Sequence, residues 1–318
     1  MKITILDGKT LGEDLNLTLL SKFGELKIYP VTKTSEKIKN IGNSEIIITN
    51  KVIIDRDTMV KCKELKLIVI AATGYNNIDI KAAEELGIAV TNVTGYSTES
   101  VVQHTFAVIL NLLHNLQYYD NYVKNGEYSK SDIFTHIERS FWSLKNRTLG
   151  IIGLGSIGRK VADTAELFGM KTVYFSTSGI DRKEKVQKVS LEDLLRNSDI
   201  VTIHSPLNDK TNNLLNKENL ILMKKSSILI NMGRGGIVNE DDIVTALNNK
   251  TICCFGTDVL TVEPITANNP LFKIKDKNRV LITPHIAWTS KESREKLINE
   301  VALNIESYLK GQKRNNLF

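Results

Sequence analysis

Strand–helix alternation runs through this chain twice, and its restart in mid-chain constrains the fold more than any other feature of the sequence. The first series has short β-branched runs between residues 2 and 92, namely KITIL, LKIY, EIIIT, LKLIVI and GIAVTN. The second series begins near residue 148 with TLGIIG, KTVYFS, DIVTIH, SSILINM, CCFGTDV and RVLIT. Segments between the runs, such as 57–64 and 80–86, have the apolar spacing of helices. Repeated strand–helix units build parallel sheets covered by helices, so we predict an α/β protein with two doubly wound parallel sheets.

Two longer helices are predicted outside these series. One runs from Ser97 to about Tyr119 and opens with Ser-Thr-Glu, residue types that cap a helix N-terminus. Polar, irregular sequence follows to about residue 146. The other helix runs from about Ser290 to Leu309, and Gly311 ends it. The length of 318 residues fits about two domains.

Composition and charge exclude several classes of protein. With 25% charged and 42% hydrophobic residues, the chain is typical of soluble globular proteins. The net charge of +6 is scattered, and its densest stretches, 182–185 and 273–279, mix acids with bases as a solvated surface does. No basic helix or aromatic–basic surface indicates nucleic-acid binding, and no apolar run is long enough to span a membrane.

Cysteine usage and the N-terminal sequence indicate the compartment. The chain has three cysteines, Cys62, Cys253 and Cys254, too few for a disulfide framework, and their spacing predicts no metal site. The first residues, MKITILDGKT, lack the apolar stretch of a secretory signal. We therefore expect a cytoplasmic protein without a metal ion.

A glycine loop opens the second series. Gly153, Gly155 and Gly158 form a GxGxxG pattern that follows a strand, 149–152, and begins a helix, 156–168. In that context the first glycine permits a tight turn, the second lets the backbone approach a pyrophosphate, and the third lets helix pack on strand. Free N–H groups at the helix N-terminus then attract phosphates. The loop therefore predicts a bound dinucleotide.

The end of the next strand lacks the acid that usually accompanies this loop. An Asp or Glu is expected there to bind the ribose hydroxyls, whereas this strand ends in Ser176, Thr177 and Ser178. The first later acid is Asp181. Hydroxyl groups bind a ribose without repelling a 2′-phosphate, so we expect NAD as the cofactor, with NADP also accepted.

Three charged residues of the second series follow predicted strands. Arg234 comes after SSILINM beside glycines, Glu263 lies five residues after Asp258, and His285 follows RVLIT and a proline. Because parallel strands bring their carboxyl ends to one edge, we expect these side chains to converge on an anionic substrate as an acid/base site. A surface arginine, a turn glutamate before Pro264 and a capped structural histidine are the alternative interpretations.

Four histidines remain outside that group. His104 lies on the apolar face of VVQHTFAVIL, which is typical of a core position, and His114 and His136 belong to no motif. His204 ends the strand DIVTIH and is expected to shape the cofactor pocket.

Several motifs together resemble the D-isomer-specific 2-hydroxyacid dehydrogenases over essentially the whole chain. GLGSIG, NMGRGGIVNEDDIVTAL, GTDVLTVEP and PHIAW occur in the order found in that family. GYSTESVVQHTFA and the HIAW ending are similar to the glycerate dehydrogenase/hydroxypyruvate reductase branch. Ser176 departs from the family's usual acid, which puts strict NAD specificity in doubt.

The resemblance implies domains and catalytic roles. A discontinuous, flavodoxin-like substrate domain would comprise 1–98 and 290–318, and a Rossmann NAD(P)-binding domain would comprise 99–289. Arg234 would bind the substrate carboxylate, His285 would act as the acid/base, and Glu263 would orient it. The loop ATGYNNID would contribute the backbone N–H groups of Gly74 and Tyr75 to the same carboxylate. A homodimer is also implied.

The resemblance further implies which residues bind the cofactor. These are Gly153, Gly155, Ser156, Ile157, Gly158, Ser176, Thr177, Ser178, His204, Ser205, Pro206, Thr211, Met232, Gly233, Asp258 and Ala287. The favoured reaction is reduction of a small 2-oxo acid, hydroxypyruvate or glyoxylate, to D-glycerate or glycolate. The hydride goes to the carbonyl carbon, and the His285 imidazolium protonates the oxygen.

Other activities are weighed against this one. A D-lactate-type or broader D-2-hydroxyacid dehydrogenase remains open, because the sequence does not define the substrate side chain. An L-specific lactate or malate dehydrogenase would have its glycine loop near the N-terminus. Formate oxidation would not need the Glu–His pair, and an adenosine-nucleoside hydrolase on this scaffold is a further alternative. A dinucleotide-sensing binding protein is the alternative outside enzymes, and the complete Arg–Glu–His set favours an enzyme.

Overall fold

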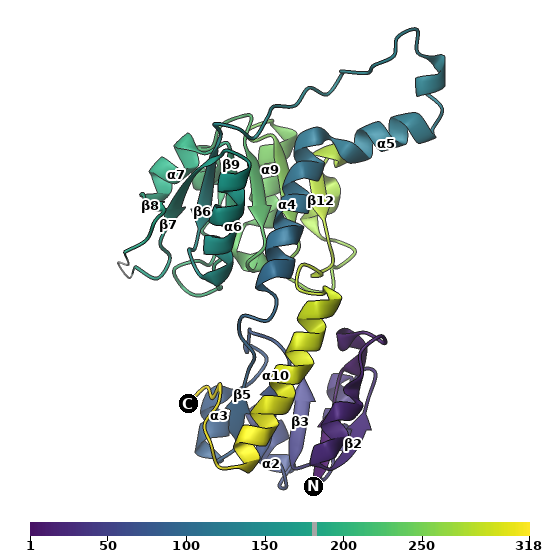
Figure 1. The fold of residues 1–318 in the computed structure, drawn as a ribbon, viewed down its shortest axis with the longest axis vertical. Coiled ribbons are helices and arrows are strands. Elements are labelled where there is room, and N and C mark those ends of the chain that lie inside the picture. The colour runs from purple at the N-terminus through teal and green to yellow at the C-terminus, as the bar shows by residue number, and fades with distance from the viewer. Residues whose placement is uncertain (180–182) are drawn as a thin grey trace. The chain divides into compact units, whose positions relative to one another are not determined.

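The computed structural model describes residues 1–179 and 183–318 and divides into two units (Figure 1). The first unit comprises 1–97 and 289–318, and the second comprises 98–288. Each unit contains a parallel sheet with helices packed on it, which confirms the predicted fold class.

In the first unit, the described residues form a five-stranded sheet of order β2-β1-β3-β4-β5. Its strands are β1 (Lys2–Ile5), β2 (Glu25–Ile28), β3 (Ile46–Thr49), β4 (Leu67–Ile70) and β5 (Ala89–Thr91). The two central strands β3 and β4 are buried along their whole length. Their nearly continuous apolar sequence is what burial on both faces requires.

Helices of the first unit connect these strands, and the chain's last helix joins them from the other end of the sequence. They are η1 (Gly8–Leu11), η2 (Leu17–Phe23), η3 (Thr34–Glu36), α1 (Lys37–Ile41), α2 (Arg56–Lys61), α3 (Ile80–Glu85) and α10 (Lys291–Leu309). α10 packs against β4 and η2, and the Ser290 side chain caps it by accepting from Ser293 N at 3.2 Å. The predicted C-terminal helix is confirmed.

In the second unit, the described residues form a seven-stranded parallel sheet of order β12-β11-β10-β9-β6-β7-β8. Its strands are β6 (Thr148–Ile152), β7 (Lys171–Phe175), β8 (Gln187–Lys188), β9 (Ile200–Ile203), β10 (Ile228–Asn231), β11 (Cys254–Thr257) and β12 (Val280–Ile282). The sequence predicted all of these except β8, which is only two residues long and carries no apolar pattern.

Helices cover both faces of this second sheet. The helices of the second unit are α4 (Thr98–His114), α5 (Leu116–Lys124), η4 (Tyr128–Lys130), α6 (Ser156–Leu167), α7 (Leu191–Asn197), α8 (Lys217–Leu220), η5 (Gly235–Ile237), α9 (Glu240–Asn248), η6 (Pro270–Lys273) and η7 (Lys277–Arg279), of which α5 and η4 do not cover the sheet. Successive strand residues enter separate cores: Ile151 packs on the side of α4 and α6, and Ile152 packs on the side of α7 and α9. This alternation is the two-residue period of a strand buried on both faces.

The predicted single helix from Ser97 to Tyr119 is wrong, because the helix is interrupted. α4 ends at His114, and Asn115 adopts a left-handed conformation with φ 52° before α5 begins. Asn tolerates that conformation better than other non-glycine residues, so it turns the chain. α5 and the residues that follow it then extend away from the sheet of the second unit, and the chain has returned by Arg139, which pairs with Asp276 (Figure 1).

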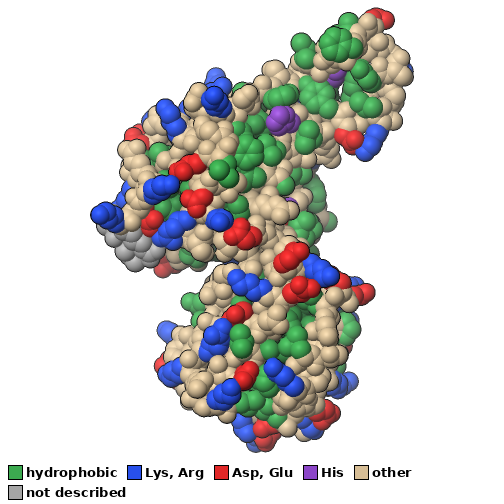
Figure 2. Space-filling model, in the orientation of Figure 1, with side chains coloured by type: hydrophobic (Ala, Val, Ile, Leu, Met, Phe, Trp, Pro, Cys, Tyr) green, Lys and Arg blue, Asp and Glu red, His purple; other side chains and the backbone are tan. Residues whose placement is uncertain are grey.

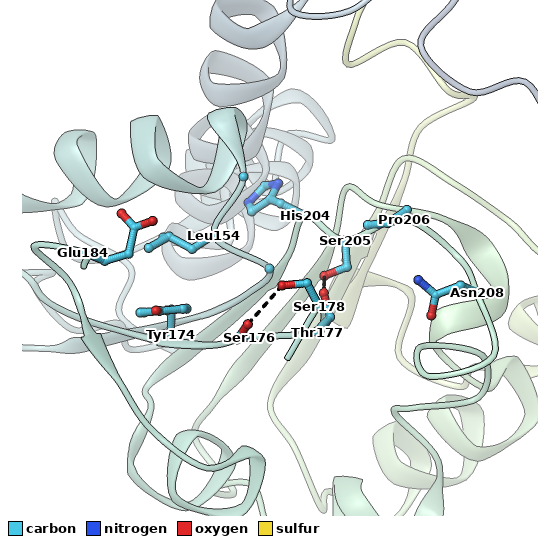
Figure 3. A pocket seen from close by; sticks show the side chains of 12 residues that line it. Leu154, Tyr174, Ser176, Thr177, Ser178, Glu184, His204, Ser205, Pro206 and Asn208 are labelled. Atoms are coloured by element: carbon cyan, nitrogen blue, oxygen red, sulfur yellow. Dashed lines mark hydrogen bonds between the residues drawn. The ribbon is translucent and has the colours of Figure 1, made fainter. Parts of the chain in front are cut away.

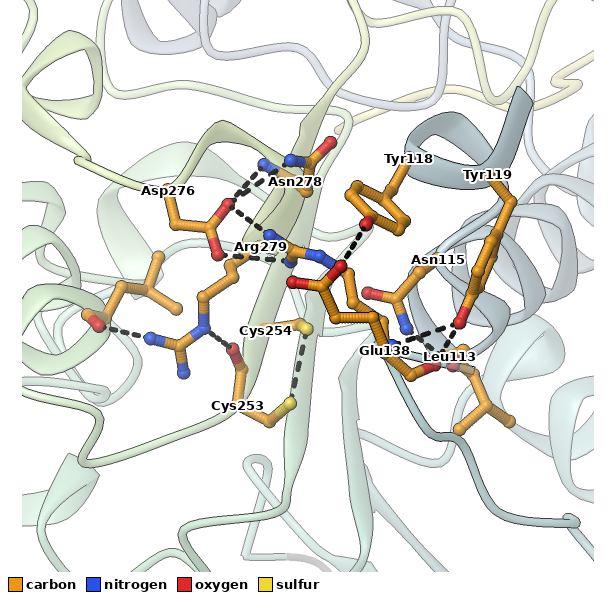
Figure 4. Close-up of polar contacts among 12 residues, drawn as sticks. Leu113, Asn115, Tyr118, Tyr119, Glu138, Cys253, Cys254, Asp276, Asn278 and Arg279 are labelled. Atoms are coloured by element: carbon orange, nitrogen blue, oxygen red, sulfur yellow. Dashed lines mark hydrogen bonds and ion pairs between the residues drawn. The ribbon is translucent and has the colours of Figure 1, made fainter. Parts of the chain in front are cut away.

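The charged stretch 273–279 is only in part the solvated surface that the sequence indicated, because Lys273, Lys275 and Lys277 are exposed whereas Asp276 and Arg279 are paired. The Arg279 guanidinium donates to the carbonyls of Leu247 at 2.6 Å, Ile252 at 2.5 Å and Cys253 at 2.7 Å (Figure 4). Asp276 accepts from Arg139 at 3.1 Å. These charges therefore hold the loop before β11 and the segment that returns from α5.

Candidate active site

A pocket lies at the carboxyl ends of β6, β7 and β9, where the strand order of the second sheet reverses. β6 pairs with β7 on one side and with β9 on the other, and such a switch point is where open α/β sheets bind ligands. The pocket holds about 200 Å³ and is lined by Gly153, Leu154, Gly155, Tyr174, Ser176, Thr177, Ser178, Glu184, His204, Ser205, Pro206 and Asn208 (Figure 3).

The three glycines of the loop occupy positions with different demands. A Cβ on Gly155 would meet no described atom within 4 Å, so its backbone is open to a ligand. A Cβ on Gly153, which has φ +92°, would lie 2.1 Å from Ser205 Oγ. A Cβ on Gly158 would lie 2.4 Å from the Gly153 carbonyl, so this position brings α6 against the loop. These are the demands that a dinucleotide fingerprint makes of its first, second and third glycine.

Two further features of the pocket fit a dinucleotide. α6 begins at Ser156, directly after Gly155, so its N-terminal N–H groups are available to phosphate. His204 lines the pocket, and its buried Nδ1 has no hydrogen-bond partner among the described residues, while Nε2 lies 3.0 Å from Thr202 Oγ1. Desolvation by the surrounding protein lowers the pKa of His204 to about 3, so the imidazole is neutral.

Hydroxyl groups occupy the end of β7. Ser176 Oγ and Ser178 Oγ lie 3.4 Å apart, and Thr177 Oγ1 lies 3.1 Å from Ser205 Oγ (Figure 3). Asp181, the first acid after the strand, lies outside the described residues. The strand end that is described therefore presents neutral groups to the pocket.

Sequence reasoning missed four residues that line the pocket: Leu154, Tyr174, Glu184 and Asn208. Leu154 could have been found, because it lies between two loop glycines. Glu184 belongs to the stretch 182–185, which was interpreted as solvated surface. Its side chain is only 13% exposed and pairs with Arg159 of α6, while Lys183 and Lys185 beside it are exposed.

Eight of the residues expected to bind cofactor do not line this pocket: Ser156, Ile157, Gly158, Thr211, Met232, Gly233, Asp258 and Ala287. Thr211 Oγ1 instead donates to the Pro206 carbonyl at 2.7 Å and accepts from Asn208 N at 2.9 Å. Thr211 therefore holds the loop that carries two lining residues.

Asp258 organises the segment that carries His285. This carboxylate is 2% exposed and accepts hydrogen bonds from Thr283 Oγ1 at 2.6 Å, Ile286 N at 2.8 Å and Ala287 N at 2.8 Å. His104 Nε2 lies 3.0 Å from Thr283 Oγ1. The loop after β12 is thus fixed from the end of β11.

His285 and Glu263 are brought together by two adjacent strands. β11 and β12 pair in parallel, and the loops at their carboxyl ends place His285 Nδ1 2.7 Å from Glu263 Oε2. The other carboxylate oxygen accepts from Leu260 N at 2.9 Å, which fixes the glutamate within its own loop. Both side chains remain partly exposed, at 23% and 30%.

Arg234 follows β10, the strand next to β11. Its Nη1 donates to the Gly233 carbonyl at 2.8 Å, and Asn231 Nδ2 donates to the Arg234 carbonyl at 2.9 Å. A Cβ on Gly235 would lie 1.9 Å from the Leu260 carbonyl carbon, so only glycine lets this loop pack against the loop of Glu263. The structure therefore brings the Arg234 loop and the Glu–His pair to one edge of the sheet.

Gly74 and Tyr75 lie in the first unit, in the loop after β4. Thr73, which precedes them, donates to the Val93 carbonyl at 2.8 Å, and Tyr75 accepts from Ile78 N at 3.0 Å. Tyr75 is 45% exposed.

In the second unit, the rings of His114 and Phe141 pack together, as do those of His136 and Tyr122.

A parallel sheet that reverses at β6, with a glycine loop between β6 and α6, is the architecture of dinucleotide-binding α/β proteins. Residues 106–287 match the family described as D-isomer specific 2-hydroxyacid dehydrogenase, NAD binding domain. The chain therefore belongs to the D-isomer specific 2-hydroxyacid dehydrogenase family.

Individual relatives match almost the whole chain. Hydroxypyruvate reductase of Blautia hydrogenotrophica is 35% identical over 98% of this chain and 98% of its own length. Glycerate dehydrogenase of Methylorubrum extorquens is 36% identical over 99% of this chain and 98% of its own length. The solved structure of D-lactate dehydrogenase from Aquifex aeolicus, complexed with NAD and lactic acid, is 29% identical with a TM-score of 0.85, covering 100% of this chain and 99% of that one.

In the described part of this chain, no helix is long and apolar enough to cross a membrane.

Proposed function

We propose that the protein is an NAD(P)-dependent reductase of small 2-oxo acids, with hydroxypyruvate and glyoxylate favoured over pyruvate and bulkier acids. The observation that carries the proposal is the 2.7 Å contact between His285 and Glu263 at the edge of the sheet where the Arg234 loop also lies. Family membership and the names of the relatives support the choice of substrate class.

His285 is the proposed proton donor. The pocket with Gly153 and Gly155 would hold NADH or NADPH, which would supply a hydride to the carbonyl carbon, and negative charge would then develop on the carbonyl oxygen. His285 stabilises that charge by donating a proton, and Glu263 holds the imidazole through Nδ1, so Nε2 is the nitrogen that gives up the proton. In the reverse direction the same nitrogen accepts the proton of the hydroxy acid.

Arg234 is the proposed ligand of the substrate carboxylate. A guanidinium can bind both carboxylate oxygens through parallel N–H bonds, which fixes the carbonyl for attack. The backbone N–H groups of Gly74 and Tyr75 are proposed as further carboxylate ligands. Formate oxidation would have no use for the Glu–His pair, so this set favours a 2-oxo acid.

The proposed cofactor site is the pocket at the carboxyl ends of β6, β7 and β9. Gly155 and the α6 N-terminus, with Ser156 and Ile157, would hold the pyrophosphate, and the residues at the end of β7 would meet the adenosine ribose. Met232, Gly233, Asp258 and Ala287 are retained as residues near the nicotinamide end. We place the enzyme in the cytoplasm, where NAD(H) is abundant and its cysteines would stay reduced.

A substrate panel tests this function. NADH and NADPH oxidation should be followed with hydroxypyruvate, glyoxylate, pyruvate and bulkier 2-oxo acids. The proposal expects the highest kcat/KM with hydroxypyruvate or glyoxylate, and D-glycerate rather than L-glycerate as the product from hydroxypyruvate. No oxidation with any 2-oxo acid would contradict it.

A homodimer is the proposed assembly, with the projecting segment as part of its interface. Apolar side chains gather on this segment: Leu116, Val123, Ile133, Phe134 and Ile137, with Phe134 89% and Ile137 76% exposed (Figure 2). Contiguous exposed apolar surface of this kind usually marks a protein–protein interface. A second copy of the chain is the occupant that the family resemblance implies.

Light scattering on a sizing column tests the assembly. The parent should elute with twice the 35.7 kDa mass of one chain, and the double substitution Phe134→Lys and Ile137→Lys should give the single-chain mass. Ile221→Lys, at an equally exposed position of the second unit, should leave the mass of the parent unchanged. A monomeric parent would contradict the proposed dimer.

A further inference from the structure

The ribose end of the cofactor pocket contains a carboxylate that does not come from the end of β7. Glu184 lines the pocket together with Ser176, Thr177 and Ser178, although eight residues separate it from Ser176 along the chain. Figure 3 shows the Glu184 carboxylate at the end of the pocket formed by Leu154 and Tyr174. Glu184 therefore brings a negative charge to the pocket, at which the described end of β7 presents only hydroxyl groups.

Arg159 holds Glu184 in this position. Arg159 Nε donates to Glu184 Oε2 at 3.1 Å, and Nη2 donates to Oε1 at 2.5 Å. This two-point contact fixes the plane of the carboxylate. The glutamate side chain is 13% exposed and the arginine 40%, so solvent screens the pair less than it screens a surface ion pair. Arg159 lies in the first turns of α6, the helix that begins at the glycine loop.

We propose that Glu184, positioned by Arg159, selects the cofactor by favouring a dinucleotide with a free adenosine 2′-hydroxyl over one with a 2′-phosphate. This inference rests on the proposed function, because it assumes that the pocket receives a dinucleotide. Glu184 supplies the acid that the family's pattern places at the strand end and that Ser176 replaces here.

Two physical effects act in the same direction. The Glu184 carboxylate accepts a hydrogen bond from a ribose hydroxyl and repels a phosphate, whose charge is close to −2. The same carboxylate also neutralises Arg159, whose guanidinium is suited to bind a 2′-phosphate. Of the other cations of this stretch that the structure describes, Lys183 is exposed, and Lys185 lies 3.6 Å from Glu166 instead.

Removing only the charge of Glu184 should therefore reverse the preference. In Glu184→Gln the amide keeps the size of the side chain, while the repulsion is lost and the Arg159 guanidinium is released to bind the phosphate. NADPH affinity should rise about tenfold or more, and NADH affinity should fall several-fold.

Fluorescence titration with NADH and with NADPH, in the absence of any 2-oxo acid, measures these affinities without turnover. Glu192→Gln is the matched control, because Glu192 pairs with Arg196 at 2.9 Å on α7, away from the pocket lining. The control should keep the parent's ratio of the two dissociation constants. The double variant Arg159→Gln, Glu184→Gln removes both charges of this ion pair, and it should lose the NADPH gain because the guanidinium that would bind the phosphate is gone.

Each outcome bears on a different claim. Suppose that the parent binds NADH, and that Glu184→Gln and the double variant both keep the parent's ratio of NADH and NADPH dissociation constants. Glu184 then does not select the cofactor, while the proposed function stands. If Glu184→Gln does not fold, the double variant decides: the inference requires its NADH affinity to fall several-fold relative to the parent, and an unchanged affinity overturns it. If the parent binds neither dinucleotide, the proposed function itself is wrong, and the inference falls with it.

Discussion

His285 Nδ1 lies 2.7 Å from Glu263 Oε2, although 22 residues separate the two side chains in the sequence. The contact exists because β11 and β12 are parallel neighbours whose carboxyl ends open into adjacent loops. It engages one nitrogen of the imidazole, so in the proposed mechanism the other nitrogen transfers the proton. A histidine whose carboxylate contact served only the structure would normally be buried, whereas His285 keeps 23% of its side chain exposed.

Arg234→Lys should raise KM for the 2-oxo acid and also lower kcat. Lysine keeps the positive charge but cannot make the two parallel bonds, so the carbonyl is bound less tightly and in a poorer orientation. A loss of about tenfold or more in kcat/KM is expected. Arg196→Lys, on the exposed surface of α7, should behave like the parent. If Arg234→Lys had the kcat and KM of the parent with every 2-oxo acid, two-point binding of the substrate carboxylate by Arg234 would be excluded.

Asp258→Ala should destabilise the second unit. The N–H groups of Ile286 and Ala287 would lose this acceptor, and leaving the N–H of the buried Ala287 unsatisfied costs about 1–3 kcal/mol. Both tryptophans, Trp142 and Trp288, belong to this unit, so urea unfolding followed by tryptophan fluorescence reports on it. The exposed Asp163→Ala should change the free energy of unfolding by less than about 0.5 kcal/mol. Equal effects of the two substitutions would show that Asp258 does not anchor the loop.

His204 should make the second unit less stable at acidic pH. Burial lowers its pKa to about 3, so below its ordinary value of 6.5 the unfolded chain binds a proton that the folded chain does not. The stabilising contribution is complete above pH 6.5 and is lost as pH falls toward 3, by up to about 1.4 kcal/mol per pH unit. Urea unfolding at pH 7.5, 6.5 and 5.5 should show a shallower decline for His204→Gln than for the parent. Equal slopes would contradict the burial of this imidazole.

Cys253 should be the most readily alkylated cysteine. Hydrogen bonding from the Cys254 thiol, aided by the nearby Arg279 cation, lowers the pKa of Cys253. Burial raises the pKa of Cys62, and hydrogen bonding to Cys253 together with burial raises that of Cys254. The rate of iodoacetamide labelling at Cys253, measured by mass spectrometry, should rise at a lower pH than the rate at Cys62. In Cys254→Ala the rise should move to higher pH, and faster labelling of Cys62 would contradict the assignment.

The sequence was sufficient for features that depend on local pattern. Period and residue type predicted the strands from β1 to β12 except β8, and the glycine loop was identifiable because a strand precedes it and a helix follows it. The positions of Arg234, Glu263 and His285 after strands followed from parallel topology, since all carboxyl ends share one edge. The contacts among these loops could not be derived from the sequence, because their close packing depends on the absence of a side chain at Gly235. The backbone that packs against Gly235 is that of Leu260, 25 residues further along the chain.

Partners of the charged residues in mixed-charge stretches could not be predicted. Glu184 and Arg279 both lie in mixed-charge stretches, and nothing local distinguishes a solvated charge from one paired across the fold. The Glu184 carboxylate is held by hydrogen bonds from Arg159, which lies 25 residues earlier in the chain. The Arg279 guanidinium is held by the carbonyls of Leu247, Ile252 and Cys253. The interruption between α4 and α5 at Asn115 was missed for a related reason. Asn also occurs within helices, so the residue type alone did not indicate the left-handed conformation that Asn115 adopts here.

The most direct test of the central claim compares turnover and cofactor binding in His285→Ala and Glu263→Gln. General acid catalysis of this kind contributes about 10²–10⁴-fold, so kcat for hydroxypyruvate reduction should fall by that factor in His285→Ala and by less in Glu263→Gln. The NADH dissociation constant from fluorescence titration should stay within about twofold of the parent in both, because neither side chain is assigned to cofactor binding. His114→Ala, outside the proposed site, should keep the parental kcat. A near-parental kcat in His285→Ala would contradict the account.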